Sequence, residues 1–181
     1  MLAMVSPRIR PVSSDDREAT RALIVRANAE FAERVPEGFF QSYLASATDL
    51  EGRLATGGDV LVAESDGRIV GTITYFREAS DEGMGPGFPP GTAGIRATAV
   101  DPASRGLGLG VALVEACLER ARADRRAAIA LHTAAFMTAA MGLYERTGFV
   151  RDRSFDFPAR EFFAYDQSPE ITALAFVRPI G

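Results

Sequence analysis

The sequence predicts an α/β (α+β) domain in which helices flank one mixed central sheet. Short runs rich in β-branched and aromatic residues recur along the chain, and amphipathic stretches with helical spacing lie between several of them. The 181 residues, of which 47% are hydrophobic, are enough to bury a core without disulfides. We therefore expect a single domain over residues 1–181, with its core at about 8–180.

The first half of the chain is predicted to form a strand, helices and a hairpin. Ser13, Ser14, Asp15 and Asp16 form a typical helix cap, and Asp66-Gly67 is a typical hairpin turn. One stripe of the first helix carries apolar side chains at helical spacing, namely Ala19, Leu23, Ala27 and Phe31. The predicted elements are a strand over 8–12, helices over 16–34, 39–46 and 50–56, and strands over 60–64 and 69–76.

The second half begins with a Gly- and Pro-rich stretch, Ala79 to Gly94, which we interpret as a long irregular loop inside the domain. Apolar periodicity then resumes and continues almost to the end of the chain. The predicted elements are strands over 95–100, 127–133, 149–157 and 171–179, helices over 109–123 and 136–146, and a polar connection over 158–170.

Composition excludes several classes of protein. The formal net charge of −4 argues against a nucleic-acid partner, and no apolar run approaches the roughly 20 residues of a membrane span. The one cysteine, Cys117, cannot form an intrachain disulfide, and Met1 to Arg10 does not resemble a signal peptide, so we expect a cytoplasmic protein. The chain contains no lysine, which excludes a Walker-type phosphate loop, and no metal site is predicted.

A glycine-rich segment, Arg105-Gly106-Leu107-Gly108-Leu109-Gly110, joins a predicted strand to a strong predicted helix. Alternating glycines let backbone N–H groups turn toward one point, and the helix N-terminus adds its own unpaired N–H groups and positive dipole end. Arg105 adds a positive charge, so the segment favours a pyrophosphate. A dinucleotide fingerprint fits poorly because Val111 occupies the position of the third glycine, and a turn without ligand is the alternative.

Two motifs then resemble those of the GCN5-related N-acetyltransferases (the GNAT family). Arg105-x-x-Gly108-x-Gly110 is similar to the family's R/Q-x-x-G-x-G/A motif, and Ala140 to Phe149 is similar to its second motif, A-x-x-x-Y-x-x-x-G-F. Ile95 to Pro102 resembles its fourth strand, and the order of elements agrees from about Arg8 to Ile180. The resemblance implies a mostly antiparallel sheet whose fourth and fifth strands splay apart around acetyl-coenzyme A, the expected co-substrate.

The resemblance also assigns roles to individual residues. Tyr144 would be the general acid that protonates the leaving thiolate, although it could instead be only a core aromatic. The Val100 N–H would stabilise the oxyanion. The residues expected to bind the cofactor are Thr98, Ala99, Val100, Arg105, Gly106, Leu107, Gly108, Leu109, Gly110, Val111, Met137, Ala140 and Tyr144.

This sequence departs from the family pattern at two positions. Met137 replaces an asparagine that contacts the pantetheine, and Gly94 occupies the position of a glutamate base. His132, the only histidine, is the catalytic candidate to replace that base, although it could equally be packed or solvent-facing at a strand end. Glu78 and Glu82 are further candidates, and an amine of low pKa needs no dedicated base.

The acceptor is expected to be a small-molecule amine. Two alternatives stay open: the enzyme could acetylate protein N-termini or lysines, or the protein could bind acyl-coenzyme A without catalysis. The acceptor pocket would form from residues 35–46, 79–91 and 158–170, and the family resemblance also admits a homodimer. Aromatic candidates for the pocket wall are Phe39, Phe40, Tyr43 and Phe88, and acidic residues that could attract a cation are Asp81, Glu82, Glu161 and Asp166.

Overall fold

The computed structural model describes residues 7–83, 87–163, 165 and 170–181. Its α-helices are α1 (Arg17–Asn28), α2 (Glu37–Thr48), α3 (Leu50–Ala55), α4 (Leu109–Ala123) and α5 (Thr138–Arg146). Short 3-10 turns are η1 (Ala29–Phe31), η2 (Ala79–Glu82), η3 (Pro102–Ser104), η4 (Arg153–Phe155) and η5 (Ala159–Glu161). The strands are β1 (Arg8–Pro11), β2 (Asp59–Ser65), β3 (Arg68–Phe76), β4 (Thr92–Val100), β5 (Ala128–Thr133), β6 (Val150–Arg151), β7 (Phe157–Pro158) and β8 (Thr172–Pro179).

The strands of the described residues form one eight-stranded sheet in the order β1-β2-β3-β4-β5-β8-β6, with β7 paired to β8. All pairs are antiparallel except β4 and β5, which are parallel. The turn between β2 and β3 has positive φ at Asp66 (50°) and Gly67 (72°), as a two-residue hairpin requires. The predicted mixed, mostly antiparallel sheet is therefore confirmed.

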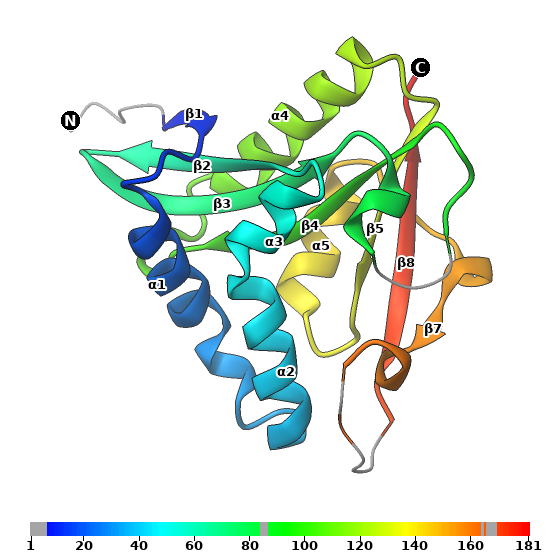
Figure 1. Ribbon diagram of the computed structural model, residues 1–181, viewed down its shortest axis with the longest axis horizontal. Coiled ribbons are helices and arrows are strands. Elements are labelled where there is room, and N and C mark those ends of the chain that lie inside the picture. The colour runs from blue at the N-terminus through cyan, green and yellow to red at the C-terminus, as the bar shows by residue number, and fades with distance from the viewer. Residues whose placement is uncertain (1–6, 84–86, 164, 166–169) are drawn as a thin grey trace.

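Helices cover both faces of this sheet (Figure 1). On one face, α4 and α5 pack against the largest apolar cluster, in which Leu61, Ile73 and Leu113 are fully buried. On the other face, α1, α2 and α3 pack through Ile24, Leu50 and their neighbours. Alternation along β2 explains the division, because consecutive strand residues point to opposite faces. No helix among the described residues is long and apolar enough to cross a bilayer.

Three local predictions were wrong. The stretch 79–94 is not wholly irregular: η2 begins at the buried Ala79, and β4 begins at Thr92, where parallel pairing with β5 satisfies the backbone. The strand predicted over 149–157 is interrupted by η4, because the Asp152 side chain accepts the Ser154 N–H at 3.1 Å and turns the chain.

The first helix also differs from its prediction. It ends at Asn28 and continues as η1, and the Asn28 side chain donates to the Ile24 carbonyl at 2.8 Å. Its buried stripe contains Leu23 and Ala27 as expected, but Thr20 and Ile24 belong to it in place of the exposed Ala19.

Candidate active site

The sheet opens between β4 and β5. Their parallel pairing covers only Thr92–Gly94 against Ala128–Ala130, and no further pairs form toward Val100. On its other side, β4 stays paired to β3 up to Val100. The fourth and fifth strands therefore splay apart, and one backbone edge of β4 faces a gap.

A bulge at Ala97 reverses the faces of β4. Arg96 pairs with Thr74 and Ala99 pairs with Thr72, so two residues of β4 oppose one residue of β3. Ala97 itself has φ of 53°, in the left-handed region. As a consequence, Ile95 and Thr98 point toward α4 and α5, whereas Arg96 and Ala99 point toward α1 and α2.

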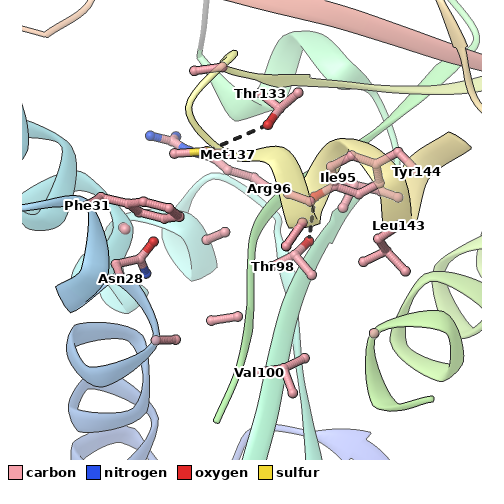
Figure 2. A pocket seen from close by; sticks show the side chains of 18 of the residues that line it. Asn28, Phe31, Ile95, Arg96, Thr98, Val100, Thr133, Met137, Leu143 and Tyr144 are labelled. Atoms are coloured by element: carbon pink, nitrogen blue, oxygen red, sulfur yellow. Dashed lines mark hydrogen bonds between the residues drawn. The ribbon is translucent and has the colours of Figure 1, made fainter. Parts of the chain in front are cut away.

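A cavity of about 510 Å³ crosses this gap and receives side chains from both faces of the sheet (Figure 2). The cavity is lined by residues expected to bind the cofactor: Thr98, Ala99, Val100, Arg105, Gly106, Gly108, Leu109, Gly110, Val111, Met137, Ala140 and Tyr144. Leu107 lies outside this lining with 59% of its surface exposed. The fold thus brings nearly all the residues expected to bind the cofactor together around one cavity.

The backbone edge of β4 presents polar groups to the gap. The Asp101 N–H donates to the Val70 carbonyl at 2.9 Å, so Asp101 points toward β3. Because backbone groups alternate along a strand, the Val100 N–H points the other way, into the gap. This N–H and that of Thr98 are available to an extended ligand arm.

The glycine loop shapes the N-terminus of α4. Gly106 and Gly108 have φ of 78° and 79°, and Gly108 is the N-cap residue. The Ala112 N–H makes a 3.0 Å bond to the Gly108 carbonyl, so the preceding N–H groups of the first turn have no partner within the helix. These N–H groups and the helix dipole could hold an anion where the glycine loop lines the cavity.

Arg105 is anchored to α1 and η1. Its guanidinium donates to the Glu30 carboxylate at 2.7 Å and to the Ala27 carbonyl at 2.8 Å. The side chain is 41% exposed. It therefore lies at the rim of the cavity, where it ties the glycine loop to the helix opposite.

Tyr144 lies on α5 with 6% of its surface exposed. Its hydroxyl donates to Thr98 Oγ1 at 3.1 Å across the cavity, as Figure 2 shows. Burial raises the pKa of Tyr144 to about 12. The phenol is consequently fully protonated at neutral pH and able to donate a proton.

The candidate bases are arranged differently. His132 lines the cavity, and its Nε2 lies 2.9 Å from the Phe155 carbonyl while its ring packs against Phe88 and Phe157. Glu78 lies outside the lining and is bound to Arg126 and to the Gly91 N–H.

Gly94 has no room for a larger side chain. A Cβ there would meet the Ala79 Cα at 3.1 Å. The side chain of Glu82 lies outside the described part of the chain.

The acceptor side of the cavity is walled by aromatic and small residues. Phe39 and Tyr43 line it as expected, but Phe40 and Phe88 are buried elsewhere. None of the described residues of 79–91 reaches the lining, so this predicted wall was wrong: Phe88 and Ala79 pack into a separate apolar cluster. Of the expected acidic residues, Asp81 and Glu161 are exposed and lie outside the lining, whereas Asp166 and the Glu82 side chain lie outside the described part of the chain.

Sequence reasoning missed several lining residues that come from α1, η1 and the bulged strand, namely Asn28, Phe31 and Arg96. Asn28 accepts a 3.1 Å hydrogen bond from the Tyr43 hydroxyl. Asn28 was missed because the apolar stripe predicted for the first helix did not include it. The direction of Arg96 depends on the bulge, which a Thr-Ala repeat does not signal.

Comparison with known proteins agrees with this geometry. Residues 22–149, more than half of the chain, match the model of the Acetyltransferase (GNAT) family. The chain is 36% identical over 108 residues to a mycothiol acetyltransferase of Sanguibacter keddieii, covering 58% of this chain and 33% of that protein. It is 33% identical over 142 residues to that of Cellulomonas flavigena, covering 77% of this chain and 39% of that protein. The chain thus spans little more than a third of the length of these relatives.

The fold matches solved structures over almost the whole chain. The PaiA N-acetyltransferase of Thermoplasma acidophilum, in complex with coenzyme A, superposes with a TM-score of 0.70 at 14% identity and covers 97% of this chain and 99% of that one. With the splayed strands and the glycine loop, the family match shows that the chain belongs to the Acetyltransferase (GNAT) family, whose co-substrate is acetyl-coenzyme A.

Proposed function

We propose that this protein transfers the acetyl group of acetyl-coenzyme A directly to the amine of a small molecule. The observation that carries the proposal is one cavity that crosses the β4–β5 gap. It joins an anion site at α4 to a buried phenol at Tyr144 and then to a walled apolar space. This sequence of features suits a cofactor arm that delivers its thioester to an acceptor beyond it.

Each group of the cofactor side has a proposed task. The first-turn N–H groups of α4 bind the pyrophosphate, and Arg105 holds the loop in place through Glu30. The exposed edge of β4 pairs with the pantetheine like an added strand, and the Val100 N–H stabilises the oxyanion as the amine attacks. Tyr144 donates its proton to the departing thiolate, while Thr98 orients the hydroxyl.

The amine is proposed to enter as the free base. Glu30 is the only carboxylate among the described lining residues, and it is ion-paired to Arg105 at 2.7 Å on the cofactor side. The described acceptor wall supplies no carboxylate base. Among the described lining residues, His132 at the end of β5 is the side chain besides Glu30 that could accept a proton.

A small acceptor is favoured by the form of the cavity. Its acceptor side is lined by α1, α2 and the segment that contains Ala159, Phe163 and Ile171. Aromatic rings pack edge to face there, with Phe39 and Phe163 centroids 5.4 Å apart. Two relatives named after a small molecule, mycothiol, also support this class of acceptor.

The test is release of coenzyme A thiol from acetyl-coenzyme A with a panel of small amines, followed by mass spectrometry of the products. We expect acetylated amine and free thiol in equal amounts. Tight cofactor binding without turnover on any amine or peptide would contradict the enzymatic proposal. Turnover on peptide N-termini alone would contradict the small-molecule acceptor.

A further inference from the structure

We propose that the acceptor amine also carries a carboxylate, and that Arg96 binds this carboxylate on the acceptor side of the cavity. The inference rests on the proposed function and specifies its substrate class. It depends on the bulge at Ala97, on a second buried arginine beside Arg96, and on the distribution of charge along the cavity.

Arg96 is directed into the acceptor side by the bulge. Without the extra residue, Arg96 and Thr98 would lie on the same face of β4, because residues two apart in a strand share a face. With the bulge, Thr98 faces Tyr144 and Arg96 faces α2, where it donates a hydrogen bond to Ser46 Oγ. Figure 2 shows the Arg96 side chain leaving β4 on the side opposite Tyr144. Arg96 and Thr98, the hydrogen-bond partner of Tyr144, therefore point to opposite faces of β4 although they are two residues apart.

Arg53 provides a second guanidinium at the same place. It is 3% exposed, and it donates to the Ser46 and Ala47 carbonyls at 3.1 Å and 2.9 Å and to Thr74 Oγ1 at 3.0 Å. Thr74 is the pairing partner of Arg96. Both arginines therefore converge on Ser46, one on its carbonyl and one on its hydroxyl.

This arrangement concentrates positive charge in a buried setting. Among the described residues, the buried Arg53 Nη2 has no hydrogen-bond partner. Burial and the nearby charge of Arg96 lower the pKa of Arg53 to about 10. A carboxylate bound to Arg96 would lie close to both guanidinium groups and would favour their charged forms.

The surroundings favour a carboxylate. The Arg96 guanidinium lies 5.6 Å from the centre of the Phe162 ring, and Tyr43 and Phe163 line the cavity nearby. An apolar wall lowers the local dielectric and strengthens a charge pair. The planar fork of an arginine matches the two oxygens of a carboxylate. Arg96 would repel a polycationic acceptor, and the described acceptor wall provides no carboxylate to bind one.

The experiment compares amino acids with their carboxamides in the thiol-release assay. Each pair shares the side chain and differs in the charge of the carboxyl group; because the amide also lowers the pKa of the α-amine, rates are compared per concentration of unprotonated amine. The proteins are the wild type, Arg96→Gln, Arg96→Lys and Ser46→Ala, with Arg122→Gln as a matched control on the exposed face of α4. Affinity for coenzyme A, measured by calorimetry, reports that each variant is folded.

We expect the wild type to prefer the acid over its amide by at least about tenfold in kcat/KM, mainly through KM. Arg96→Gln should abolish this preference, Arg96→Lys should retain part of it, and Arg122→Gln should leave it intact. Ser46→Ala should weaken it, because Ser46 orients the guanidinium. Equal turnover of acid and amide, or a preference that survives in Arg96→Gln, would overturn the inference while the proposed function stands.

If the protein acetylates neither compound, turnover on the wider amine panel decides the proposed function separately. Calorimetry of the same pairs on the protein with coenzyme A then decides the carboxylate site. Acid binding that exceeds amide binding and is lost in Arg96→Gln supports the site, and equal binding overturns it.

Discussion

The Tyr144 hydroxyl donates a hydrogen bond to Thr98 Oγ1 at 3.1 Å, which joins α5 to β4 beside the gap between β4 and β5. The Thr98 side chain reaches Tyr144 only because the bulge at Ala97 turns it toward α5. The backbone irregularity and the proposed acid are therefore parts of one arrangement.

Replacing Tyr144 with phenylalanine should remove the proton donor and leave the ring in place. We expect kcat to fall about 100-fold, in the range of general acid catalysis, with coenzyme A affinity changed less than about twofold. Tyr75→Phe is the matched control, since Tyr75 is also buried and donates to Asp124 at 2.8 Å outside the cavity. An unchanged kcat in Tyr144→Phe would remove Tyr144 as the acid.

The pH profile of kcat/KM should rise as the amine loses its proton and then stay level. Because burial raises the pKa of Tyr144 to about 12, the phenol stays protonated and no alkaline decline is expected below about pH 11. The same raised pKa means that the folded state loses stability as the pH rises from about 10 through 12. A decline near pH 9 that Tyr144→Phe abolishes would contradict this assignment.

Gly108→Ala should weaken coenzyme A binding by about tenfold, because the left-handed backbone at the N-cap of α4 aims the first-turn N–H groups. Gly57→Ala is the control: its φ is 87°, and at both positions an added Cβ meets nothing within 4 Å. Both variants should lose about 1 kcal/mol of unfolding free energy in urea titrations. Equal cofactor affinity in the two variants would argue against the pyrophosphate site.

Ala97→Gly should stabilise the protein by about 0.5–1 kcal/mol, because glycine adopts positive φ without steric cost. Ala93→Gly on the same strand is the control and should destabilise it by about 1 kcal/mol, since Ala93 is fully buried. Chemical unfolding of both variants measures the difference. A loss at position 97 as large as that at 93 would show that the bulge carries no strain.

Cys117 should be unreactive in the native protein. It is fully buried in α4, and burial raises the pKa of its thiol well above its usual range. We expect no reaction with a disulfide reagent until the protein is unfolded, and full activity in Cys117→Ala. Rapid labelling of native protein, blocked by acetyl-coenzyme A, would instead favour an acyl-cysteine route over direct transfer.

Much of the fold was predictable because its signals are local. The helix predicted over 109–123 matches α4 at both ends, because its apolar stripe lies within the segment and its glycine N-cap, Gly108, directly precedes it. The glycine loop and Tyr144 were found for the same reason, because each belongs to a short motif of fixed spacing. The family and the splayed sheet followed from these motifs and are confirmed.

The acceptor side was predictable only in part: Phe39 and Tyr43 line it as expected, but other parts of its wall depend on contacts distant in sequence. Arg96 meets Ser46 across 50 residues, and its direction depends on an alanine in a left-handed conformation. Phe88 was assigned to the acceptor wall from its loop, but it packs with Phe155 instead. Tertiary packing, rather than local pattern, determines which aromatic side chains reach the cavity.

A crystal structure with bound coenzyme A is the most direct test of the cofactor site. We predict the thiol sulfur in the β4–β5 gap, within hydrogen-bond reach of Tyr144 Oη, and the pyrophosphate on the first-turn N–H groups of α4. Coenzyme A bound outside this gap, or with its sulfur turned away from Tyr144, would contradict the account.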